Sequence, residues 1–293
     1  MDMGGHIHEI LRIFFGRLAR HGLNIFEIGI HQAFIQALSA ADEYFRSVPF
    51  LDTIEFFEYQ KKEFLAGLDL ADGEDSATFK SREGVFALLL RFEEENFRHR
   101  VPEGIEYEFG YGEKPRPRLG RAGLKGVIDR FDRDTNEKGL YHIYDYKTGA
   151  MPTYLRIKKG LSFQLPVYIR ALKTCLNAQK TTAALYSLKK DNIRKKGPLG
   201  QYISDNAGKA GLDITGLLLP DKYVDKLIDL LEEGRFHHST DMEKCSHCDF
   251  KYACHRDERR MDRLVNSDID HGLYSGLKNL ESWNDAEKFK EEL

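Results

Sequence analysis

The chain has 293 residues, of which 41% are hydrophobic, so it can bury the core of one large domain or two small ones. Its 44 basic and 47 acidic residues give a net charge of −3, which argues against a protein that coats nucleic acid by bulk charge. Local basic clusters, which suit a groove, occur at residues 155–160, 188–197 and 255–263.

No apolar run approaches the ~18 residues that span a bilayer, and the N-terminus lacks the basic start of a secretory signal. Three of the 4 cysteines lie within ten residues, which indicates metal binding in a reducing compartment rather than a disulfide framework. We therefore expect a cytoplasmic protein with no membrane partner.

The first hundred residues carry a helical apolar period. It runs through residues 8–23 and 33–45, and a third strong helix is expected at 81–100, where Pro102 should end it. After residue 100 the period changes to two, which is typical of strands. We expect strands at residues 105–110, 124–134, 140–149 and 181–190. Further helices are expected at residues 162–176, 227–233 and in the charged tail, 257–293.

The turn-forming stretch 134–139 joins two of these strands, so they should form an antiparallel hairpin. Asp145 and Lys147 lie two residues apart on its second strand, and their side chains share a face. A turn centred near Asn136 would place Asp129 opposite Ile143, on the same side of the sheet. Buried charges are costly unless they are paired or bind something. The hairpin therefore carries either an ion pair at a sheet margin or a metal site.

The Asp-x-Lys spacing is weak evidence alone, because Asp249 and Lys251 repeat it and a surface ion pair is the default interpretation. Two adjacent carboxylates repel, but a divalent cation between them removes that cost. Mg²⁺ takes oxygen ligands and can lower the pKa of a bound water. A lysine alongside can orient that water or offset charge at phosphorus, which is the chemistry of phosphodiester hydrolysis.

Four short motifs in a fixed order raise the metal-site interpretation above the ion pair. They are Gly5-x-x-His8-Glu9, Gly126-x-x-Asp129-Arg130, Asp145-x-Lys147 and Gln164-x-x-x-Tyr168. The last pair has i, i+4 spacing and so shares one helix face. This series resembles the PD-(D/E)XK nucleases of the RecB and AddB type, and the resemblance spans residues 4 to about 256.

The resemblance implies an α/β fold, with a restriction-endonuclease-like core in which helices flank a mixed central β-sheet. An N-terminal helical portion would pack against this core. We expect residues 1–100 to form the helical portion with the His8 motif, 101–240 the nuclease core, and 241–293 the cysteine segment and helical tail. All three parts would belong to one nuclease domain.

The same resemblance assigns roles to individual residues. The catalytic residues would be Asp129, Asp145 and Lys147, the ligands of Mg²⁺ or Mn²⁺ would be His8, Asp129 and Asp145, and the supporting residues would be Gln164 and Tyr168. Glu106 fits an acidic position of the family more loosely. Without the neighbouring motifs, the favoured interpretation of His8 is a histidine of an amphipathic helix. Gln164 and Tyr168 could equally be ordinary helix-surface residues.

The implied activity is metal-dependent cleavage of DNA, as an exonuclease on single-stranded ends in double-strand break repair and recombination. The chain has no Gly-x-x-x-x-Gly-Lys-Ser/Thr phosphate loop, so unwinding would come from a helicase partner or a helicase region of a longer chain. Two alternatives stay open: a CRISPR-adaptation-type exonuclease with four cysteines, and an inactive DNA-binding module of the same fold. The intact set of Asp129, Asp145 and Lys147 favours an enzyme.

The cysteine segment has the spacing of a zinc or iron–sulfur site, with ligands Cys245, Cys248 and Cys254. It resembles the last three cysteines of the AddB-type nucleases, where a fourth, upstream cysteine completes a [4Fe–4S] cluster. No cysteine precedes the first motif here, and Cys175 is expected to be a buried apolar residue. The fourth ligand could come from a longer chain, from His247 or His255, or be missing in a vestigial site. Of these we expect the first.

Overall fold

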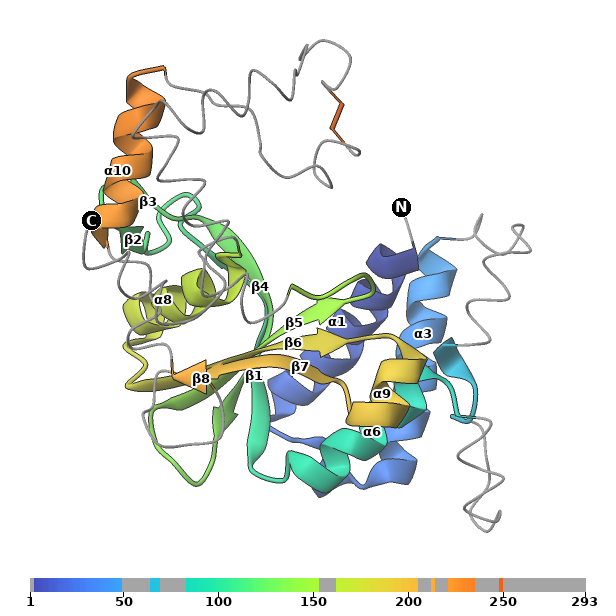
Figure 1. Ribbon diagram of the computed structural model, residues 1–293. Coiled ribbons are helices and arrows are strands. Elements are labelled where there is room, and N and C mark those ends of the chain that lie inside the picture. The colour runs from blue at the N-terminus through green and yellow to red at the C-terminus, as the bar shows by residue number, and fades with distance from the viewer. Residues whose placement is uncertain are drawn as a thin grey trace. The chain divides into compact units, whose positions relative to one another are not determined.

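The computed structural model describes residues 3–48, 64–68, 83–152, 162–204, 212–213, 221–234 and 248–249 (Figure 1). The chain divides into two compact units. The first comprises Met1–Pro117, Leu124–Pro152 and Gln164–Thr215, and the second comprises Arg118–Gly123, Thr153–Phe163 and Gly216–Leu293. The expected division at residues 100 and 240 stays a prediction.

A mixed six-stranded sheet forms the centre of the first unit (Figure 1). In spatial order its strands are β1 (Arg100–Phe109), β4 (Gly126–Asp134), β5 (Leu140–Lys147), β6 (Lys180–Ser187), β7 (Leu199–Ser204) and β8 (Leu212–Asp213). β4 runs antiparallel to both of its neighbours, β1 and β5, whereas β6 is parallel to β5. The helix α8 (Gln164–Leu176) lies between these two strands in sequence, as a parallel connection requires. The expected α/β class with a mixed sheet is confirmed.

The hairpin of β4 and β5 forms as expected, with one difference in register. Asp134 accepts two backbone N–H groups of the turn at 2.8 and 2.9 Å. Ile143 faces Phe131 rather than Asp129, so the predicted register was wrong by two residues. Because side chains alternate with period two, this shift leaves Asp129 on the expected face and moves it toward Asp145.

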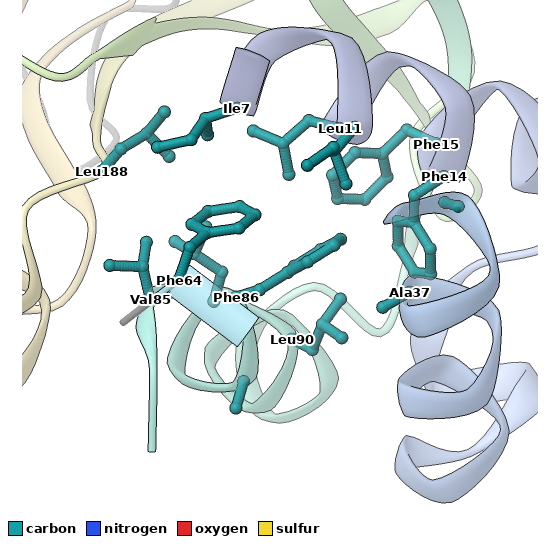
Figure 2. Close-up of a cluster of buried hydrophobic side chains, with 14 of the residues drawn as sticks. Ile7, Leu11, Phe14, Phe15, Ala37, Phe64, Val85, Phe86, Leu90 and Leu188 are labelled. Carbon is teal, nitrogen blue, oxygen red and sulfur yellow. The ribbon is translucent and has the colours of Figure 1, made fainter. Parts of the chain in front are cut away.

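Helices from the N-terminal part of the chain cover one face of this sheet with an apolar core. They are α1 (Met3–His21), α2 (Ile25–Ile28), α3 (Ile30–Ser47) and α6 (Val85–Asn96). The helical period of α1 places Ile7, Leu11 and Phe14 on its buried side, and Figure 2 shows them facing Phe86 of α6. Tyr144 of β5 contributes to the same core from the sheet. The expected N-terminal helical portion is therefore present.

Two sequence-based expectations about this unit were wrong in detail. The third long helix ends at Asn96, and Pro102 lies inside β1, next to an irregularity in the pairing with β4. β1 is an edge strand, where the missing N–H of proline is tolerated. The strand expected at 181–190 ends at Ser187, and the short helix α9 (Lys190–Lys196) follows it. That helix has one buried apolar residue, too few to produce a visible period.

The second unit contains a two-stranded sheet, β2 (Arg118–Leu119) with β3 (Ala122–Gly123), and the helix α10 (Asp221–Glu232). The helix expected at 227–233 is thus confirmed in type. Arg121 binds α10, because its backbone N–H donates to Asp225 at 2.6 Å and its guanidinium pairs with Asp229. Among the described helices of both units, none has the length and apolar character to cross a membrane.

A buried histidine on β5 makes the stability of this fold depend on pH. His142 lies 2.7 Å from the hydroxyl of Thr182 and 3.1 Å from a carboxylate oxygen of Asp134. Burial, followed by the charge of Arg100, lowers the pKa of His142 to about 4, although Asp134 opposes the shift. The unfolded chain, with a histidine pKa of about 6.5, therefore takes up this proton first. The neutral His142 ring therefore contributes fully to the free energy of unfolding above about pH 6.5. This contribution is lost as the pH falls toward 4.

We expect the free energy of unfolding to fall over this acidic window, and to fall less steeply in His142→Gln, which has no titrating ring. Urea denaturation at a series of pH values measures both slopes. Equal slopes for the parent and the variant would mean that other groups cause the acid sensitivity.

Candidate active site

Two neighbouring strands place three charged residues at one end of the sheet. Asp129 lies near the start of β4, and Asp145 and Lys147 near the end of β5. The two strands run antiparallel, so these positions meet at the same sheet end. Asp129 Oδ2 accepts the backbone N–H of Tyr146 at 2.8 Å, which joins its carboxylate to β5. The acids expected to converge therefore do so.

The first helix brings a histidine to the same place. His8 Nδ1 lies 3.9 Å from Asp129 Oδ2, and its ring makes an edge contact with Tyr146 at a centroid separation of 5.6 Å. A nitrogen of His8 and one carboxylate oxygen each of Glu106 and Asp129 lie within 4.8 Å of one another. Three groups able to bind a metal thus come together from α1, β1 and β4.

Glu106 is the member of this group that the sequence indicated least clearly. In β1, Ile105 pairs with Arg130 and Tyr107 with Ile128, so Glu106 stands opposite Asp129. Its φ is +48°, a left-handed conformation that costs a non-glycine residue on the order of 1–3 kcal/mol. Burial, followed by the charge of Asp129, raises the pKa of Glu106 to about 7. The sequence did contain a signal for Glu106, because it is an acidic residue in a predicted strand close in the chain to the strand of Asp129.

Asp145 is almost fully buried, and both its oxygens have neighbours. Gln164 Nε2 donates to Asp145 Oδ1 at 2.5 Å and lies 3.0 Å from the hydroxyl of Tyr168. Lys147 Nζ lies 2.5 Å from Asp145 Oδ2. The two residues expected as supports are therefore in contact with the site through Asp145. Asp145 itself is outside the three-residue group that contains His8.

The charges of the site favour a bound cation. Burial and then the negative charge of Asp129 raise the pKa of Asp145 to about 6, against the opposing charge of Lys147. Burial also raises the pKa of Asp129, which the Tyr146 N–H and Lys147 oppose. Carboxylates held this close to one another are less costly with a hard cation between them. Carboxylate oxygens and one imidazole nitrogen form a donor set that fits a divalent ion such as Mg²⁺ or Mn²⁺.

The structure does not test the cysteine cluster. Most of the residues named for it lie outside the described residues: Cys245, Cys254, His247 and His255. Cys248 is described, within the second unit. Cys175 is only half-buried, and its thiol donates to the carbonyl of Pro115 at 3.6 Å, so the expectation of a buried apolar residue was wrong. Cys175 lies on α8, and its side chain interacts with that of Tyr107 of β1.

A sequence profile described as the PD-(D/E)XK nuclease superfamily matches residues 2–255. The chain belongs to this superfamily. The chain is also 32% identical over 144 residues to a protein of Moorella thermoacetica that is named as one subunit of an ATP-dependent helicase/deoxyribonuclease. That match covers 44% of this chain and 12% of the relative, so the chain spans only a small part of the length of this longer protein. The resemblance in the four motifs is thereby confirmed at the level of the family.

Proposed function

We propose that this nuclease hydrolyses DNA phosphodiester bonds with Mg²⁺ or Mn²⁺ and acts as an exonuclease on single-stranded ends. One observation carries the proposal. An imidazole and two carboxylates from three different elements lie within 4.8 Å of one another, beside a third carboxylate paired with an ammonium. Burying these charged groups together costs desolvation free energy, and a bound cation and substrate would offset that cost.

Under this proposal His8, Glu106 and Asp129 hold the cation, with Asp145 as a further ligand. A divalent cation bound there supplies a more acidic water and stabilises negative charge on the phosphate. The chain contributes fixed geometry. The Tyr146 N–H holds one oxygen of Asp129 in place, so less reorganisation is needed when substrate binds.

Lys147 is the proposed catalytic lysine. Its side chain is 27% exposed and so can reach a phosphate as well as its partner Asp145. Its ammonium would offset the negative charge that develops on the phosphate oxygens. Gln164 would hold the Asp145 carboxylate toward Lys147, and Tyr168 would hold Gln164.

The proposed biological setting is double-strand break repair in the cytoplasm, with a helicase supplying single strands. The name of the relative combines a helicase with a deoxyribonuclease, and this chain matches 12% of that protein. The present sequence has no phosphate loop for ATP, so a separate region or protein would unwind the DNA. The cysteine cluster stays a prediction outside this proposal.

The proposal is tested with end-labelled single-stranded and blunt duplex DNA in Mg²⁺, in Mn²⁺ and in EDTA. We expect single strands to shorten progressively from an end with either cation and to remain intact in EDTA. Asp145→Ala should leave the DNA uncut, because one oxygen of this residue contacts Lys147 and the other contacts Gln164. Glu137→Ala is the matched control, an acid in the turn at the opposite end of β5.

Three results would contradict parts of the proposal. If Asp145→Ala degrades DNA as fast as the parent, the site is wrongly assigned. If circular single strands are cut, the protein acts internally and not from ends. If the parent binds DNA but never cuts it with either cation, the chain is an inactive binding module.

A further inference from the structure

We propose that the basic segment 189–196, which contains α9, binds the phosphate backbone of the DNA strand beside the active site, an inference that rests on the proposed function. The segment reads Lys-Lys-Asp-Asn-Ile-Arg-Lys-Lys, with five basic residues and one acid, in a chain whose net charge is −3. The exposed cations are Lys189, Arg194, Lys195 and Lys196. A local positive patch of this kind is the electrostatic footprint of a nucleic-acid contact.

The sheet places this segment next to the proposed catalytic lysine. β5 and β6 run parallel, and Lys147 pairs with Ser187 at their shared end. The backbone N–H of Leu188 then donates to the carbonyl of Lys147 at 2.9 Å. Lys189 is the next residue, so its Cα lies within about 10 Å of the Cα of Lys147 by strand geometry. A single strand with one phosphate at Lys147 can thus place another near Lys189.

The segment is held firmly to the core on its other side. Ile193 is buried, and Leu188 packs in the same core cluster as Ile7 (Figure 2). Asn192 Nδ2 donates to Ser187 Oγ at 3.1 Å, which fastens α9 to the end of β6. The backbone that carries the exposed lysines is therefore anchored to the core through Leu188, Asn192 and Ile193, and the lysine side chains themselves are exposed.

Helix electrostatics account for only part of this charge. Cations near a helix C-terminus are favourable, which explains Lys195 and Lys196, but a cation at the N-terminus is unfavourable, and Lys189 is there. Within the described part of the chain, Lys189, Lys195 and Lys196 form no ion pair. Their ammonium groups can therefore bind an anion, and a DNA backbone presents a row of phosphates.

The experiment measures binding of a fluorescent oligothymidylate over a range of salt concentrations, in the Asp145→Ala background so that the probe stays intact. We compare the triple variant Lys189→Gln, Lys195→Gln, Lys196→Gln with a control of equal charge change, Arg133→Gln, Lys138→Gln, Lys180→Gln. The control residues lie at the other end of the hairpin and of β6. We expect the first triple to bind at least about tenfold more weakly at low salt, and its salt slope to fall by about 2. The control should bind within about twofold of its parent.

The outcomes separate this inference from the function on which it rests. If the parent cuts DNA but the α9 triple binds with unchanged affinity and slope, the inference is overturned and the nuclease proposal stands. If the parent binds without cutting and the triple still loses affinity, hydrolysis is excluded and the α9 contact is supported. If the thermal midpoint of the triple falls, Lys189→Gln alone is measured, and an unchanged salt slope then overturns the inference.

Discussion

Replacing Lys147 with methionine should lower the rate of DNA cleavage about 10³-fold, the size of effect seen when a charge-stabilising donor is removed from a transition state. Methionine keeps most of the length of the side chain and loses its charge. Asp145 would lose the ammonium that lies 2.5 Å from its Oδ2, and the phosphate would lose a neighbouring cation. Single-turnover cleavage of end-labelled single-stranded DNA with saturating Mg²⁺ measures the rate.

Lys180→Met serves as the matched control for this effect. Lys180 starts β6, pairs with Leu140 at the far end of the same parallel ladder and contacts Glu137 in the turn. This variant should cleave at the parent rate. A Lys147→Met protein that retains more than about a tenth of the parent rate would exclude an essential electrostatic role for the ammonium.

Replacing Arg130 with methionine should destabilise the fold by about 3–5 kcal/mol, the cost of leaving buried charges without their partner. Its guanidinium is almost completely buried and donates to Glu93 at 2.8 and 2.9 Å and to Asp132 at 2.6 Å. It also lies 3.7 Å from the ring centroid of Phe15. Without it, two carboxylates remain buried on the core side of β4. The midpoint and slope of chemical denaturation, followed by circular dichroism, give the change.

Two comparisons make this prediction specific to the buried ionic cluster. Arg133→Met, on the same strand, removes an exposed pair with Glu103 and should cost about 1 kcal/mol or less. Adding Glu93→Gln and Asp132→Asn to Arg130→Met should recover part of the loss, because the uncompensated charges disappear. Equal losses from the two arginine variants would show that the cluster contributes no more than a surface pair.

The Arg130 cluster and the proposed active site are joined through two neighbouring residues of β4, whose side chains point to opposite faces of the strand. Asp129 points toward the site, and its neighbour Arg130 points into the core, where Glu93 of α6 and Tyr186 of β6 join it. The hydroxyl of Tyr186 donates to Glu93 at 2.8 Å. The Asp-Arg pair of the second motif therefore combines a site residue with the residue that fastens β4 to the helical layer.

Local patterns in the sequence predicted most of the elements and the family. The helical period of residues 8–23 predicted α1, the alternation and turn residues predicted the β4–β5 hairpin, and the spacing of Gln164 and Tyr168 placed both on one face of α8. These features depend on neighbours a few residues apart, which a single chain displays directly. The short α9 escaped notice because one buried isoleucine gives no period.

The sequence alone determined which residue types are present, in which order and on which kind of element. Only the tertiary structure decided which of them meet: Glu106 with His8 and Asp129, Asp145 with Gln164, and Leu188, just before α9, with Lys147 at the end of β5. Such contacts follow from the register of β1 against β4, from a left-handed backbone at Glu106 and from the parallel pairing of β5 with β6. Each depends on packing between segments distant in sequence, and such packing leaves no periodic trace in either segment.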